Sequence, residues 1–201
     1  MHEGERQMTM REAFETYFKN LDTSYRQEYG NHPKVVYRSE CDKKGIYISG
    51  TLDSEGYAEW QPVLQDEPIM FEDLESELGF TIHPHIKQYF TTYWFMQLAG
   101  DRGEDQFYLE SIEPNVNIIE LVRQCYEKAN IDYMKPGVFC AIGDAYMDEN
   151  EDCGLYVNNE TGEVICVDWD EAGYYDFEIP FAETSFKVAD SLMDLIKDLQ
   201  W

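Results

Sequence analysis

The chain has 201 residues, of which 41 are Asp or Glu and only 15 are Lys or Arg, so its formal net charge is −26. A surface this acidic repels phosphate groups, which excludes a non-specific nucleic-acid binder and electrostatic binding to an anionic lipid surface. Apolar residues make up 43% of the chain and aromatic residues 15%. This is enough to form a hydrophobic core, so we expect a folded domain and not a disordered acidic tail.

The chain carries no sign of export or membrane insertion. Its first residues lack the basic and apolar regions of a signal peptide, and its apolar runs are far shorter than the roughly 20 residues of a membrane span. An odd number of cysteines, widely spaced and without a C-x-x-C pair, favours a reduced cytoplasmic protein over a disulfide framework. They are Cys41, Cys125, Cys140, Cys153 and Cys166.

The first part of the chain predicts a helix followed by short strands. Thr9 to Glu12 has the pattern of a capping box, and apolar side chains then recur at helical spacing until Gly30. Three runs of β-favouring residues follow at 35–37, 45–49 and 57–62, separated by polar or glycine-containing turns.

The middle of the chain predicts three helices and one strand. A helix at 71–78 ends at Gly79, and a second begins at Pro84, a residue favoured in the first turn. A strand at 106–111 precedes the clearest amphipathic helix, at 117–130.

The last part predicts strands at 138–142, 155–157 and 164–169, with a hairpin loop at 158–162, and a closing helix at 185–199. The order helix, strands, helices, strand, helix, strands, helix is typical of an α+β fold with antiparallel pairing. Without a linker or repeat, residues 1–201 are expected to form a single domain with an ordered core at about 9–199.

The acidic charge is concentrated in one stretch. Residues 136–186 contain 13 Asp or Glu and no Lys or Arg, with aromatic residues interleaved. Such a stretch could be a solvated surface that confers solubility, or a face that attracts a cationic partner and anchors it with aromatic side chains. The absence of any basic residue over this length favours the binding face.

Patterns for metal sites and catalysis are incomplete. Asp148, Asn150 and Asp152 have the spacing that opens an EF-hand loop, but Cys153 stands where the turn requires glycine and Asn159 where the closing Glu is required.

His83 and His85 could suggest a metal pair, yet the other two histidines, His2 and His32, complete no zinc ligand set. A helix entry with histidines at its start is the simpler interpretation. No nucleophile elbow, phosphate-binding loop or dinucleotide fingerprint is present. We therefore expect no cofactor, no metal and no enzymatic activity.

Three motifs together indicate a family. Trp60-Gln61-Pro62 precedes an I-x-P-x-I-x-x-Y-F-T-T segment at 82–92, and Ala99-Gly100-Asp101 follows. In this order they resemble the Syd family of the SUKH superfamily. The resemblance extends over 14–199, with its specific residues at 57–101. Four extra residues within 93–98 and the acidic segment 144–178 depart from the family pattern.

The resemblance implies a single α+β domain, with a twisted, mostly antiparallel sheet backed by helices, that binds a partner and catalyses nothing. Syd proteins are associated with the SecY translocase, whose cytoplasmic loops are basic, and many SUKH relatives are immunity proteins that neutralise bacterial toxins. Trp60 and Asp101 are carried over as family-motif positions, for which packing is the expected role.

The main hypothesis from the sequence is a cytoplasmic, non-enzymatic immunity protein that neutralises a toxin domain, such as a nuclease, by binding its basic surface. The alternative is a Syd-type regulator that binds the basic loops of SecY at the inner face of the membrane through that protein, without direct lipid binding. Either partner would be steered by charge and held by aromatic anchors. The predicted contacts are Asp148, Glu149, Glu151, Asp152, Asp168, Trp169, Asp170, Glu171, Tyr174 and Tyr175.

Overall fold

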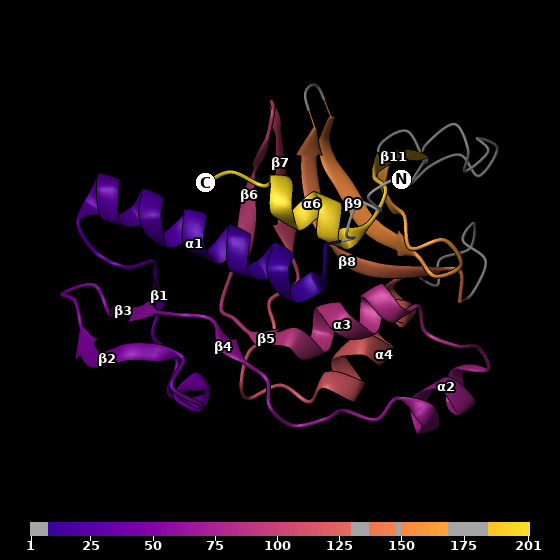
Figure 1. Ribbon diagram of the computed structural model, residues 1–201, viewed down its shortest axis with the longest axis horizontal. Coiled ribbons are helices and arrows are strands. Elements are labelled where there is room, and N and C mark those ends of the chain that lie inside the picture. The colour runs from indigo at the N-terminus through magenta and orange to yellow at the C-terminus, as the bar shows by residue number, and fades with distance from the viewer. Residues whose placement is uncertain (1–7, 130–136, 148–149, 169–184) are drawn as a thin grey trace, which may run out of the picture.

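A computed structural model describes residues 8–129, 137–147, 150–168 and 185–201 (Figure 1). Its centre is an antiparallel sheet of six strands in the order β11-β10-β9-β8-β7-β6. The strands are β6 (Leu98–Arg102), β7 (Asp105–Leu109), β8 (Phe139–Met147), β9 (Asn150–Asn158), β10 (Val164–Asp168) and β11 (Ser185–Ala189).

One face of this sheet is covered by helices. Figure 1 shows α1, α3 and α6 along one side of the strands, and α4 packs against β8. Phe107, Ile142 and Leu155 from the sheet share one hydrophobic core with Phe14 of α1 and Ile86 of α3. The helices are α1 (Met10–Tyr29), α3 (Pro84–Thr92), α4 (Ile118–Lys128) and α6 (Leu192–Asp198).

Two small sheets and two short helical segments complete the described structure. The first small sheet has the order β1-β3-β2, and the second joins β4 to β5. Their strands are β1 (Lys34–Val36), β2 (Tyr47–Leu52), β3 (Tyr57–Trp60), β4 (Val63–Leu64) and β5 (Tyr93–Trp94). A 3₁₀ turn, η1 (Ser39–Cys41), and the helix α2 (Glu72–Leu78) lie in the connections.

Most element boundaries agree with the local sequence signals, and the α+β class is confirmed. Thr9 and Glu12 form the reciprocal capping box at the start of α1. Gly30 and Gly79 end α1 and α2 with φ of +75° and +78°, in the left-handed region where glycine is favoured. Pro84 occupies the first turn of α3.

The predicted closing helix at 185–199 is wrong over its first part. Ser185–Ala189 is the edge strand β11, paired antiparallel with β10 so that Phe186 lies opposite Cys166. The helix begins at Leu192, where the Ser191 hydroxyl accepts a hydrogen bond from the Asp194 N–H. Apolar residues three apart at the start of this segment resemble a helical stripe, but the pairing groups of β10 stabilise the extended backbone instead.

Besides β11, three more strands have no counterpart among the sequence predictions: β6 and the short pair β4 and β5. Val63 and Leu64 of β4 pair with Trp94 and Tyr93 of β5. The segment 93–98, within which the sequence comparison predicts four extra residues, therefore begins with a strand that pairs with the segment after the Trp60-Gln61-Pro62 motif.

Candidate functional site: the outer face of strands β6 to β8

Most of the predicted contacts cannot be placed on a surface. Asp148, Glu149, Trp169, Asp170, Glu171, Tyr174 and Tyr175 lie outside the described residues, and Glu151 and Asp152 are described only as backbone positions in β9. Asp168, at the end of β10, is described and its side chain is only 4% exposed. A carboxylate buried to this extent differs from the exposed contact expected from the sequence.

The first family motif is part of the core. The Trp60 ring is 2% exposed and meets the Phe18 ring edge-on, with 6.1 Å between centroids. Its backbone N–H donates to the Pro33 carbonyl over 3.0 Å, which joins β3 to the start of β1. Packing, the role expected of Trp60, is what these contacts provide.

The second motif forms the buried helix α3. Ile82, Ile86 and Phe90 are inaccessible to solvent, and the buried Tyr89 hydroxyl donates to the Glu110 carbonyl over 2.6 Å. The motif therefore attaches α3 to the core and to the end of β7.

The two histidines of this segment form the helix entry. The His83 ring accepts a hydrogen bond from the His85 N–H, and burial lowers the pKa of both side chains. Within the ranges that the structure describes, His, Cys, Asp and Glu form no group of three or more that could hold a metal ion.

The third motif allows the C-terminal residues to cover the edge of the sheet. Two residues of β6 turn their backbone N–H and carbonyl away from β7, toward the edge of the sheet. The N–H and carbonyl of Ala99 both bond to the Tyr17 hydroxyl, at 3.1 Å and 2.6 Å. The N–H and carbonyl of Asp101 bond to the backbone of Gln200, at 2.7 Å and 2.8 Å. A Cβ on Gly100 would lie 2.5 Å from the Gln200 oxygen, so only glycine permits this approach. Covering these groups blocks the edge of the sheet against pairing with other chains.

An exposed row of polar and aromatic side chains crosses β6, β7 and β8 on the face opposite the core. Asp101 lies opposite Gln106, which lies opposite Tyr146, and in the next row Tyr108 lies opposite Asp144. Directly paired residues project from the same face of a sheet. We call Asp101, Gln106, Tyr108, Asp144 and Tyr146 the outer face.

Two tyrosines dominate the outer face. Tyr108 is 44% exposed and Tyr146 is 45% exposed, and their rings meet edge-on with 5.6 Å between centroids. Further along the sheet, Val167 continues the row of Tyr108 and Asp144 but belongs to a second hydrophobic cluster and is buried. Along this row of the described strands, exposed side chains therefore lie on β7 and β8, and the row is buried at Val167 of β10.

A hollow of about 180 Å³ lies beside the outer face, between β6, β7 and the last two residues of the chain. Trp201 borders it and is 41% exposed, and the Trp201 ring packs on the Tyr25 ring of α1, with 5.3 Å between centroids. The hollow is lined by Ala99, Gly100, Asp101, Gln106, Tyr108, Gln200 and Trp201.

Tyr108, Gln106 and Trp201 were not among the residues predicted from the sequence. The alternation of exposed Gln106 and Tyr108 with buried Phe107 and Leu109 is a period-two pattern in which a large aromatic residue falls on the polar face. That pattern could have identified Tyr108. Its partner Tyr146 lies in the acidic stretch 136–186, but only the strand register places the two rings together.

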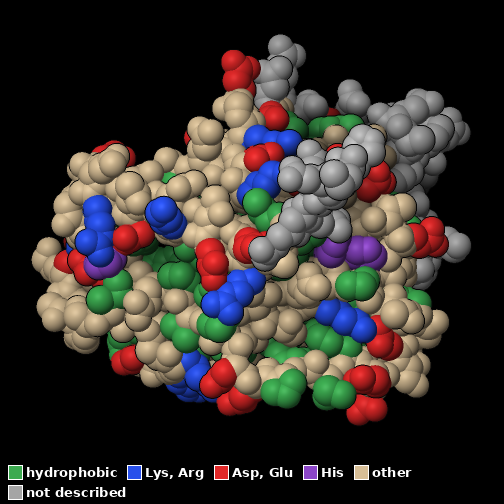
Figure 2. All heavy atoms as spheres, in the orientation of Figure 1, with side chains coloured by type: hydrophobic (Ala, Val, Ile, Leu, Met, Phe, Trp, Pro, Cys, Tyr) green, Lys and Arg blue, Asp and Glu red, His purple; other side chains and the backbone are tan. Residues whose placement is uncertain are grey.

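The positive charges of the chain are largely neutralised internally. In the parts of the chain that the structure describes, every Lys and Arg except Lys19 and Lys43 forms an ion pair with Asp or Glu. On the face shown in Figure 2, the Lys and Arg side chains lie beside Asp and Glu. Because the acids are in excess, the remaining surface charge is negative.

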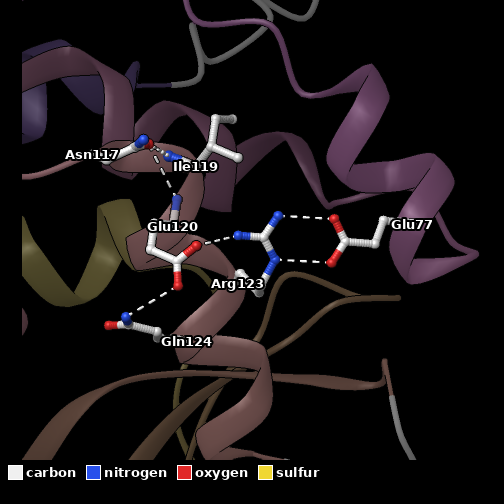
Figure 3. Close-up of polar contacts among 6 residues, drawn as sticks. All are labelled: Glu77, Asn117, Ile119, Glu120, Arg123 and Gln124. Atoms are coloured by element: carbon white, nitrogen blue, oxygen red, sulfur yellow. Dashed lines mark hydrogen bonds and ion pairs between the residues drawn. The ribbon is translucent and has the colours of Figure 1, made fainter.

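Arg123 of α4 is the clearest of these pairs (Figure 3). Its Nε and a terminal nitrogen donate to both oxygens of Glu77 on α2, over 2.9 Å and 2.8 Å, and it also contacts Glu120. Its hydrogen bonds to Glu77 raise the pKa of Arg123. This guanidinium joins two helices and is not available to a partner.

Asp101 differs from the acids in such pairs. No Lys, Arg or His among the described residues forms an ion pair with its exposed side chain. Its neighbour in sequence, Arg102, instead contacts Asp198 and the Val188 carbonyl. Asp101 therefore lines the hollow together with Tyr108 and Trp201, and no cation of the described ranges is paired with its carboxylate.

The sheet, its helical cover and the exposed tyrosines define an α+β domain whose outer face suits binding to another protein. Among the described helices, none combines the length and the apolar composition that a membrane span requires. The sequence model of the Syd protein family (SUKH-2) matches residues 11–110, a range that contains all three motifs. The chain belongs to this Syd (SUKH-2) family.

Curated relatives agree with the family. Protein Syd of Shewanella pealeana is 26% identical over 193 residues, which span 92% of this chain and 79% of the relative. Protein Syd of Pseudoalteromonas atlantica is 28% identical over 74% of this chain and 78% of the relative. Over a shorter range, covering 36% of this chain and 40% of the relative, Protein Syd of Idiomarina loihiensis is 34% identical.

Proposed function

We propose that the chain is a non-enzymatic, cytoplasmic binding protein of the Syd type, which binds the basic cytoplasmic loops of the SecY translocase. Membership of the Syd family supports this partner. The observation that carries the binding mode is the outer face, where two exposed tyrosines in edge-on contact share the surface of β6 to β8 with Asp101 and Asp144.

The outer face combines the two properties that a basic partner requires. Net negative charge steers a cationic loop toward the surface, which can raise association rates about 10- to 10³-fold at low ionic strength. Exposed tyrosines then supply large, rigid contact areas, and tyrosine is one of the residue types enriched among the residues that contribute most to protein interfaces. Charge would set the rate of encounter, and Tyr108 and Tyr146 would slow dissociation.

A second candidate function is neutralisation of a toxin domain, the main hypothesis from the sequence. The SUKH-2 designation of the matching family and the net charge of −26 support it, because a toxin that binds nucleic acid presents a basic groove. The same outer face would serve both partners. The Syd designation of each relative favours SecY.

Binding to vesicles tests the proposal. We expect the chain to sediment with proteoliposomes that contain SecY and not with vesicles of the same lipids alone, and to bind more weakly as salt rises from about 50 mM to about 500 mM. The double substitution Tyr108→Ala and Tyr146→Ala should weaken binding at least tenfold, since each lost anchor is worth about 1–2 kcal/mol.

Tyr57→Ala is the matched control, because Tyr57 is a partly exposed strand tyrosine in the three-stranded sheet, away from the outer face. Equal loss in the control and in the double variant would contradict the proposed binding mode. Absence of SecY binding, together with protection of cells against a toxin encoded at a neighbouring locus, would favour the second function.

A further inference from the structure

The hollow beside the outer face combines one carboxylate with two aromatic walls. Asp101 stands on β6, Tyr108 on β7 and Trp201 at the end of the chain, and all three line the same space of about 180 Å³. That space is more than ten times the roughly 10–15 Å³ that one water occupies by the same kind of measure, so it accommodates a planar polar group. Gln106 adds an amide to the same wall.

This combination matches the chemistry of arginine. A guanidinium group is planar, stacks on aromatic rings and forms paired hydrogen bonds with a carboxylate, whereas the ammonium of lysine is a compact point charge. Arg102, the adjacent cation of the chain, is directed to Asp198 and the Val188 carbonyl. It therefore does not take this place.

The walls of the hollow are held in position before any partner arrives. Two backbone hydrogen bonds join Asp101 to Gln200, and Trp201 packs on Tyr25 of α1. Gly100 gives the close approach that these contacts need. Because these side chains lose little further conformational freedom on binding, less of the interaction free energy is offset by the entropy cost of ordering them, and the affinity is higher.

We propose that the hollow is a subsite for a single arginine side chain of the protein partner, with Asp101 as its counter-ion and Tyr108 and Trp201 as its stacking walls. The inference rests on the proposed function, since it assigns one residue type of the basic partner to one place on the outer face. The subsite differs from a general attraction between the acidic surface and a positive charge, because a lysine side chain should not replace the arginine in it.

A titration with small probes tests the subsite apart from any partner. N-acetyl-arginine amide is added to the full chain while the indole Nε1–H signal of Trp201 and the amide signals of Asp101 and Gln106 are followed by NMR. We expect saturable shifts at these positions. Nα-acetyl-citrulline amide, which has a similar shape and no charge, should leave these signals unchanged. Nα-acetyl-lysine amide, which keeps its charged ε-ammonium group, should bind at least fivefold more weakly.

Asp101→Asn keeps the backbone bonds of β6 and should weaken arginine binding about tenfold, whereas Asp73→Asn, at an exposed acid of α2, should have no effect. Equal shifts with citrulline, equal affinity for lysine, or unchanged binding in Asp101→Asn would overturn the inference. If SecY proteoliposomes bind Asp101→Asn as tightly as the original chain, the subsite fails and the proposed function stands. If the probe binds as expected and SecY does not, the subsite stands and that partner is wrong.

Discussion

Gly100→Ala should loosen the C-terminal residues from the edge of the sheet. The added Cβ would lie 2.5 Å from the Gln200 oxygen and 3.3 Å from the Leu199 Cβ, so the backbone at Gln200 has to move. The two hydrogen bonds to Asp101 would then be lost, at about 0.5–1.5 kcal/mol each, together with about 0.5–1.5 kcal/mol from the contact between Trp201 and Tyr25.

Alanine offsets part of this cost, because glycine within a strand is about 0.5–1 kcal/mol less favourable than alanine. The net loss should be about 0.5–4 kcal/mol in the free energy of unfolding, measured by urea denaturation with circular dichroism. Gly50→Ala is the matched control: Gly50 also lies in a strand, β2, and a Cβ there would meet no atom within 4 Å. It should be neutral or slightly stabilising.

Removing Gln200 and Trp201 separates this cause from a general effect of the substitution. In the shortened chain Gly100→Ala should cost much less, because the Gln200 oxygen at 2.5 Å is absent and only the contact with the Leu199 Cβ at 3.3 Å remains. A substituted full-length chain as stable as the original, with the Asp101 amide still protected from hydrogen exchange, would refute the explanation.

Three further predictions concern the connections around the core. Asn159→Ala should lower the free energy of unfolding by about 2–4 kcal/mol, because its amide bonds the His83 N–H, the Thr81 carbonyl and the Tyr126 hydroxyl; an unchanged urea midpoint would contradict this. Glu77→Gln should shift the urea midpoint only slightly in the same assay, because the pair with Arg123 is partly exposed, and a shift as large as that of Asn159→Ala would disprove its peripheral role. Burial lowers the pKa of His85 below its ordinary value of 6.5, so the stability that depends on its neutral form is present above about pH 6.5 and is lost as the pH falls below that value. Between about pH 7.5 and 5.5, His85→Gln should therefore lose less free energy of unfolding than the original chain, and identical losses would contradict the assignment.

Local signals identified most helices because a helix end depends on residues close in sequence. The capping box at Thr9, the left-handed glycine at Gly30 and the proline at Pro84 each act within one turn. The strand β11 was mistaken for helix since its extended state depends on β10, a partner separated from it along the chain.

In the candidate site, too, some features have a local signal in the sequence and others depend on distant strand pairing. The excess of acid and the motif that contains Asp101 are visible in the sequence, and so is the acidic stretch that contains Asp144 and Tyr146. That Tyr108 and Tyr146 meet edge-on follows from the register of β7 and β8, and the place of Trp201 follows from the pairing of Gln200 with Asp101. Neither the contact between the two tyrosine rings nor the place of Trp201 is indicated by residues close to them in the sequence.

Site-specific photo-crosslinking tests the central claim, that the outer face contacts a basic protein surface, most directly. A photoreactive phenylalanine analogue is placed in turn at positions 108, 146 and 57, and each chain is irradiated with SecY proteoliposomes. We expect crosslinks from 108 and 146 to the basic cytoplasmic loops of SecY and none from 57. Crosslinks from 57 alone, or equal crosslinking from all three positions, would contradict it.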